Sequence, residues 1–151
     1  PIQPAMIQLY TIGFTEKSAE RFFDLLAGNG VTCITDTRVN TTGQLSGFAK
    51  GSDLAFFART IGNMQYAHHL DLAPTRELLA RYRAKELTWE AYETEYLNLI
   101  DMRGVKRHFP VETLHRHCLL CSEHGPERCH RRLLAEYLQA ARSDVEIVHL
   151  K

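Results

Sequence analysis

The 151-residue sequence has no excess of charge of either sign, because 18 Lys and Arg balance 18 Asp and Glu. A neutral balance argues against a generally basic coat for nucleic acid, although it is compatible with a local basic patch. No apolar run approaches the roughly 20 residues of a membrane helix, and the charged-then-apolar pattern of a signal peptide is missing at the start. The sequence therefore predicts a soluble, cytoplasmic protein without a membrane partner.

Proline and glycine are also scarce, at five and nine residues, which excludes a collagen-like or disordered chain. Hydrophobic residues make up 44% of the sequence and charged residues 24%. This is the composition of one ordinary globular domain with a sizeable core. Residues 1–5 carry no pattern, so we expect a disordered or vector-derived segment there, followed by a single domain over residues 6–151.

Short segments typical of strands alternate along the chain with amphipathic segments typical of helices. The segments expected to be strands are 7–12, 31–35, 64–66, 117–121 and 145–150. Helices are expected at 19–27, 52–61, 75–85, 89–102 and 127–141, several of them preceded by a capping Ser or Thr. This alternation predicts an α/β fold, a single three-layer domain with a mostly parallel sheet of about five strands flanked by helices.

Polar residues follow these strands at their carboxyl ends, which is the edge where open parallel sheets bind ligands. Four separate segments deliver such residues to that edge, and their convergence predicts one functional site. The residues gathered in this way are Gly13, Thr15, Asp36, Arg38, His68, His69, Cys121 and Glu123. The polar loop 39–51 is long for a compact domain and directly follows Arg38, so we expect it to act as a lid.

Residues 115–130 hold three of the four cysteines and four of the eight histidines. This segment is predicted to run from a strand through a tight turn into a helix that starts near Cys129, His130 and Arg131. A helix N-terminus exposes unpaired N–H groups and a partial positive charge, which suit phosphate or carboxylate. Arg128 and Arg131 add bidentate donors to the same place.

The thiols in this region have several interpretations. Zinc accepts the ligand types of Cys118, Cys121, His124 and Cys129, but Cys118 and Cys121 flank an apolar strand core and point to opposite faces of it. A looser catalytic metal site that uses Cys121, Cys129 and a histidine stays open as an alternative. The spacing does not fit the anion-binding loop of a phosphatase or sulfurtransferase. That loop needs an arginine after five intervening residues, and Glu127 occupies this position after Cys121.

A single thiol is expected to stand out in reactivity. The helix dipole and nearby cations favour the thiolate of Cys129, whereas apolar strands disfavour those of Cys33 and Cys118. We therefore expect Cys129 to titrate lowest and the latter two to be inert core residues. Tyr82, Tyr92 and Tyr96 are interpreted as packing on helix faces.

The interpretation that fits most of the pattern is an enzyme, a hydrolase or transferase, with a pocket for a phosphate-bearing substrate of the nucleotide or nucleic-acid class. No cofactor is identifiable. Its binding residues would be Gly13, Thr15, Arg38, Arg128, His130 and Arg131. Its catalytic candidates are Asp36 and Glu123 for proton transfer, with Cys121 and Cys129 as reserve nucleophiles. The alternatives are a metal-binding protein using the Cys/His cluster and a non-catalytic nucleic-acid-binding module using Lys106, Arg107, Arg128, Arg131 and Arg132.

Several of these segments together resemble one family. They are Thr11-Ile12-Gly13, Asp36-x-Arg38, and Leu120-Cys121-Ser122-Glu123 followed by Cys129-His130-Arg131. This combination resembles the domain-of-unknown-function 488 (DUF488) family, and the stretches 44–48 and 72–75 resemble one branch of it. The resemblance covers nearly the whole chain from Met6 and implies a compact α/β fold with an enzymatic site of unassigned reaction. Val39-Asn40 departs from the commoner family pattern, in which a proline follows the Asp-x-Arg segment.

Overall fold

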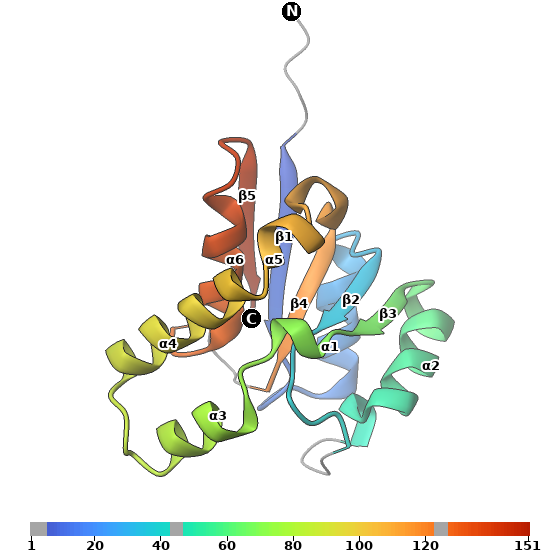
Figure 1. Cartoon of the computed structure of the whole chain (residues 1–151). Helices are drawn as coiled ribbons and strands as arrows, with labels where there is room; N and C mark the ends of the chain where they lie inside the picture. The colour runs from blue at the N-terminus through green and yellow to red at the C-terminus, as the bar shows by residue number, and fades with distance from the viewer. Residues whose placement is uncertain (1–5, 43–46, 123–126) are drawn as a thin grey trace, which may run out of the picture.

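A parallel sheet runs through the middle of the molecule in the computed structural model, which describes residues 6–42, 47–122 and 127–151 (Figure 1). The strands are β1 (Ile7–Gly13), β2 (Cys33–Asp36), β3 (Gln65–His68), β4 (His117–Cys121) and β5 (Val145–Leu150). Their order across the sheet is β3-β2-β4-β1-β5, and neighbouring strands pair in parallel. The predicted α/β class with a five-stranded sheet is confirmed.

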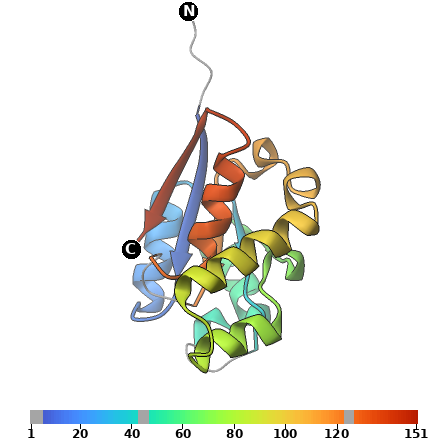
Figure 2. The same ribbon diagram turned by 60° about the vertical axis from the view of Figure 1, so that its left-hand side comes forward.

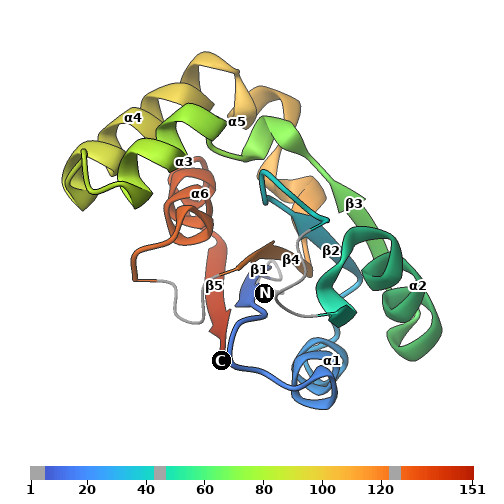
Figure 3. The same cartoon turned by 90° about the horizontal axis from the view of Figure 1, so that it is seen from below.

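Helices connect the strands and cover both faces of the sheet (Figure 3). They are α1 (Ala19–Gly28), α2 (Gly51–Gly62), α3 (Arg76–Arg83), α4 (Trp89–Met102), α5 (Val105–His108) and α6 (His130–Gln139). Ser18, Thr75 and Thr88 cap α1, α3 and α4 by accepting a hydrogen bond from a backbone N–H of the first turn. No helix within the described ranges is long and apolar enough to cross a membrane.

The sheet separates two hydrophobic cores. Phe22 of α1 and Leu54 of α2 pack with Leu120 on one face, and Tyr96 of α4 packs with Leu119 on the other. Leu119 and Leu120 are both fully buried because successive residues of a strand point to opposite faces. Helix α6 lies along β1 and β5 on the α4 side (Figure 2).

The register of the sheet brings the carboxyl ends of its central strands together. Gly13 of β1 lies opposite Cys121 of β4, and Asp36 of β2 lies opposite Leu120. The chain leaves β2 towards α2 on one face and leaves β4 towards α6 on the other face. A crevice forms where neighbouring strands of a parallel sheet send their connections to opposite faces. The site therefore belongs at the ends of β2 and β4.

Element boundaries differ from the sequence expectation at a few places. Helix α3 ends at Arg83 rather than at residue 85, where Lys85 has a positive φ of 61°. Helix α6 begins at His130 rather than at residue 127, because Cys129 is an extended N-cap. The third strand runs to His68 instead of Tyr66. Residues 1–5, expected to be disordered or vector-derived, lie outside the described ranges.

Candidate functional site

A cavity of about 650 Å³ lies where the ends of β2 and β4 and the start of α6 face α3 and α4. Residues from five separate segments line it: Arg38, Val39 and Asn40; Arg76, Leu79, Ala80, Tyr82, Arg83 and Ala84; Trp89 and Tyr92; Cys121 and Ser122; and Arg128, Cys129 and His130. Within the described part of the chain, the lining includes four arginines and neither Asp nor Glu. The cavity wall is therefore cationic although the chain as a whole is neutral.

Helix α3 supplies two of these arginines from one face. Arg76, Leu79, Ala80 and Arg83 stand at positions i, i+3, i+4 and i+7, which share one side of a helix. Arg76, Arg83 and Arg128 are exposed, and no hydrogen bond or ion pair between described residues engages their guanidinium groups. Their charges are thus available to a ligand.

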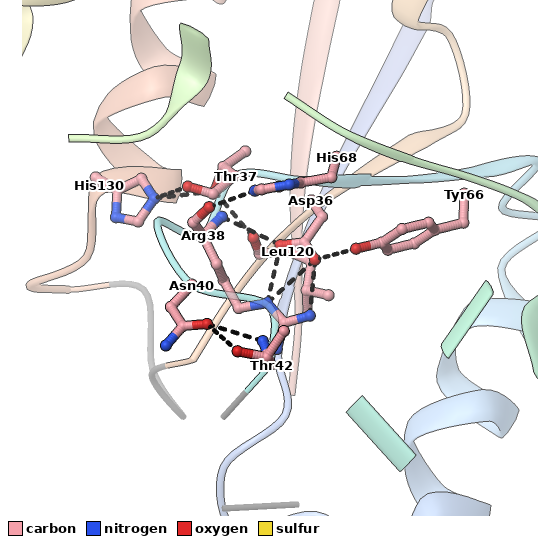
Figure 4. A network of polar contacts seen from close by, with 9 residues as sticks. All are labelled: Asp36, Thr37, Arg38, Asn40, Thr42, Tyr66, His68, Leu120 and His130. Carbon is pink, nitrogen blue, oxygen red and sulfur yellow. Dashed lines mark hydrogen bonds and ion pairs between the residues drawn. The ribbon is translucent and has the colours of Figure 1, made fainter. Parts of the chain in front are cut away.

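The fourth arginine, Arg38, is held by a buried carboxylate (Figure 4). Its Nη2 donates to Oδ2 of Asp36 at 2.7 Å and its Nε donates to Oδ1 at 2.9 Å. The Tyr66 hydroxyl donates to the same Oδ2 at 2.6 Å, and Asp36 is completely buried. Burial opposes the charge of Arg38, but the hydrogen bond and charge of Asp36 outweigh it and raise the Arg38 pKa. Asp36 therefore fixes a permanently charged Arg38 and cancels its net charge.

His130, on the first turn of α6, is fixed in one tautomer. Its Nε2 lies 2.8 Å from the carbonyl oxygen of Thr37, so Nε2 carries the proton and donates it. The Thr37 hydroxyl donates to the carbonyl of Leu120 at 2.9 Å and lies 2.9 Å from the same Nε2 (Figure 4). Burial, reinforced by the charge of Arg131, lowers the pKa of His130 to about 4. His130 is therefore a neutral ring at the cavity wall at neutral pH, with Nδ1 as an acceptor.

Cys121 and Cys129 are joined by a disulfide that links the end of β4 to the N-cap of α6. This corrects the expectation of a free, low-pKa Cys129 thiol, because its sulfur is bonded to Cys121. The Nη1 of Arg131 lies 3.2 Å from Sγ of Cys121. Cys33 and Cys118 are free and buried, and burial raises the pKa of both thiols, as expected of core residues.

A metal centre does not form among the described residues, which contain no group of three or more His, Cys, Asp or Glu side chains able to hold an ion. Cys118 belongs to the core on the α1 side of the sheet, and it is separated from Cys121 by strand alternation. His124, the fourth ligand of the zinc hypothesis, lies outside the described ranges.

The remaining predicted site residues lie around the cavity rather than in its described wall. Gly13 ends β1 opposite Cys121, and the Thr15 hydroxyl donates to the carbonyl of Ser122. Asp36 and Arg131 are fully buried behind the lining residues that they contact. Glu123 lies outside the described ranges, as do residues 43–46 of the expected lid. Two other residues of that loop, Val39 and Asn40, do line the cavity.

The reasoning from the sequence missed the contribution of α3 and α4. Arg76 and Arg83 were not selected, although their i and i+7 spacing on a predicted helix could have marked a shared cationic face. Tyr92 is buried in the core, as the packing interpretation expected, but it and Tyr82 also line the cavity together with Trp89. These residues belong to helices that close over the sheet edge, and the strand ends alone do not indicate them.

No curated protein and no solved structure matches the chain significantly. A family model described as "Domain of unknown function DUF488" matches residues 18–138. The match includes Asp36, Arg38 and the segment from Cys121 to Arg131, and it covers most of the chain. The chain belongs to the DUF488 family.

Proposed function

We propose that the cavity binds a phosphate-bearing ligand of the nucleotide class, as the substrate of a hydrolase or transferase. The observation that carries this proposal is a cationic wall combined with aromatic rings in one cavity of suitable size. Pockets of roughly 300–1,000 Å³ hold ligands of this kind, and this one measures about 650 Å³.

The charges favour an anion with more than one negative charge. Arg76, Arg83 and Arg128 add three positive charges that no described carboxylate in the lining cancels. Planar guanidinium groups bind phosphate oxygens in a bidentate manner. Helix α6 also starts at this wall, and its N-terminal N–H groups favour a phosphate in the same place.

The aromatic residues favour a ligand that carries a ring. Tyr82, Trp89 and Tyr92 line the cavity, and the rings of Trp89 and Tyr92 stack with centroids 5.4 Å apart. Trp89 and Tyr82 are half-buried, so they keep surface that a nucleobase can contact. A simple phosphate or sugar phosphate would use the arginines but would not cover the exposed surface of Tyr82 and Trp89.

Asp36 is already engaged by Arg38, so proton transfer to or from the substrate requires another group. Both oxygens of Asp36 accept hydrogen bonds from Arg38, and one also accepts from Tyr66. We assign Asp36 to positioning Arg38 in this proposal. Glu123, which follows Ser122 in the sequence, is the sequence-based candidate for acid–base catalysis.

The chain contains one tryptophan, Trp89, which gives a direct binding assay. Titration with a nucleoside triphosphate, a nucleoside monophosphate, the nucleoside and inorganic phosphate should change Trp89 fluorescence, with the triphosphate binding most tightly. Arg83→Gln should weaken that binding about tenfold, because a hydrogen bond to a charged group contributes about 1.5 kcal/mol or more.

Arg81→Gln is the matched control, since Arg81 lies on the same helix but pairs with Glu95 outside the cavity. Its nucleotide affinity should equal that of the unmodified protein. Equal affinity for nucleoside and triphosphate, or an Arg83→Gln variant that binds as the control does, would contradict the proposal.

A further inference from the structure

We propose that Cys121 and Cys129 form a redox-active disulfide, in which an external dithiol attacks Cys129 and Cys121 departs as a thiolate. Both residues line the cavity, so the bond borders a space that a reactant can enter. This inference does not depend on the nucleotide proposal.

The surroundings of Cys121 are suited to a sulfur that carries negative charge. Nη1 of Arg131 lies 3.2 Å from Cys121 Sγ, and Arg131 is completely buried. A guanidinium beside a sulfur stabilises the thiolate over the thiol and so makes that sulfur the better leaving group. The position of Arg131 in the first turn of α6 keeps the cation beside the end of β4.

Both cysteines are buried, Cys121 at 1% and Cys129 at 4% exposure, so the charge beside them distinguishes the two sulfurs. Cys121 ends a central strand of the sheet, whereas Cys129 is the N-cap of α6 and follows the exposed residues Glu127 and Arg128. Attack on a disulfide proceeds at the sulfur that is reached more easily and expels the sulfur whose thiolate is more stable. The cation beside Cys121 therefore selects Cys121 for departure, and Cys129 is the sulfur that is attacked.

The reaction is an ordinary two-electron exchange with a dithiol. A thiolate of the reductant attacks Sγ of Cys129, the bond between the two protein sulfurs breaks, and its electron pair stays on Sγ of Cys121 beside Arg131. The second thiolate of the reductant then attacks the mixed disulfide and releases Cys129. The reductant ends as a disulfide and the protein as a dithiol.

The redox step can be measured on the purified full chain without a ligand. The protein is equilibrated in mixtures of reduced and oxidised dithiothreitol, quenched with acid, alkylated and analysed by mass spectrometry. Cys121 and Cys129 should change together from disulfide to two thiols as the ratio changes, while Cys33 and Cys118 stay thiols throughout. If Cys121 and Cys129 are thiols at every ratio, or pair with other cysteines, the proposal is overturned.

A second measurement tests the role of Arg131. In Cys129→Ser, ultraviolet thiolate absorbance, minus that of Cys121→Ser/Cys129→Ser, should give Cys121 a pKa well below the ordinary value of about 8.5. Arg131→Gln should raise that pKa, and Arg132→Gln, which removes a neighbouring cation bonded to Glu136, should leave it nearly unchanged. A Cys121 pKa at or above the ordinary value overturns the assignment even if Arg131→Gln does not fold.

Discussion

At the scale of single residues, Asp36 shows how the site is held together. Its carboxylate is buried and accepts hydrogen bonds from the Arg38 side chain, the Arg38 backbone and Tyr66. Asp36→Asn leaves a buried guanidinium without its counter-charge, which typically costs about 3–5 kcal/mol. We therefore expect a loss of that size in the free energy of unfolding measured with urea.

The matched control is a pair exposed to water. Arg81 and Glu95 are 3.0 Å apart with side chains more than two-fifths exposed, so Glu95→Gln should cost less than about 1 kcal/mol. If the two variants lose similar stability, the buried pair does not organise this edge of the sheet as the structure indicates.

His130 makes stability depend on pH in mildly acidic solution. Its pKa is lowered by burial to about 4 in the folded chain, against about 6.5 when unfolded. Between these values the unfolded state binds the extra proton and the folded state does not. The contribution of His130 to the free energy of unfolding is therefore fully present above about pH 6.5 and is lost as the pH falls towards 4. The shift corresponds to a loss of about 3 kcal/mol.

The pH dependence can be assigned by substitution. Urea unfolding followed from pH 7 to pH 4 should show a smaller decrease in His130→Asn than in the unmodified chain, with the remainder due to groups such as His117, whose pKa burial also lowers. His108 is exposed, so His108→Gln should keep the full decrease. Identical slopes in His130→Asn and the unmodified chain would show that His130 is not buried as a neutral ring.

At the scale of elements, α3 depends on its N-cap. The Thr75 hydroxyl accepts a hydrogen bond from the backbone N–H of Leu78 at 3.0 Å, and loss of such a cap costs about 1 kcal/mol. Thr75→Ala should therefore increase amide hydrogen exchange in α3, the helix that carries Arg76 and Arg83.

A matched cap lies on the other face of the sheet. Ser18 accepts from the backbone N–H of Arg21 at the start of α1. Ser18→Ala should speed exchange in α1 and leave α3 unchanged. Equal effects of both variants on both helices would mean that exchange reports global unfolding rather than local opening.

The sequence predicted the elements better than their ends. The runs 117–121 and 145–150 coincide with β4 and β5, because short, largely apolar segments of this length are typical of buried strands. Ends were less certain because they depend on single backbone angles. The positive φ of Lys85, for example, has no signal in its residue type.

The candidate site was only partly accessible to sequence reasoning. Arg38, Arg128 and His130 are predicted from a strand end and a helix start, and the structure brings them to one cavity. The spacing of Arg76 and Arg83 marks a shared helix face, but the position of that face over the cavity depends on how the long connection between β3 and β4 folds. The Cys121–Cys129 bond was also missed, because pairing depends on spatial approach across a turn rather than on spacing.

At the scale of the whole molecule, charge is distributed unevenly although it sums to zero. The arginines of the cavity gather at one edge of the sheet, whereas acidic residues such as Glu93, Asp101 and Glu136 line a second hollow between α4 and α6. A neutral total gives little long-range attraction for anions, so the proposed nucleotide ligand would be recognised by short-range contacts in the cavity.

The position of β1 also has a consequence for biosynthesis. This strand is made first, yet its two neighbours in the sheet are β4 and β5, more than 100 residues further along the chain. During translation the apolar β1 therefore leaves the ribosome well before either partner exists, and it stays unpaired until β4 and β5 have emerged. Sheets that depend on such distant pairings form slowly, and their apolar, aggregation-prone surface stays exposed until the pairing is complete. Until β4 and β5 have emerged, the unpaired edges of β1 are therefore a place where the nascent chain can associate with other molecules.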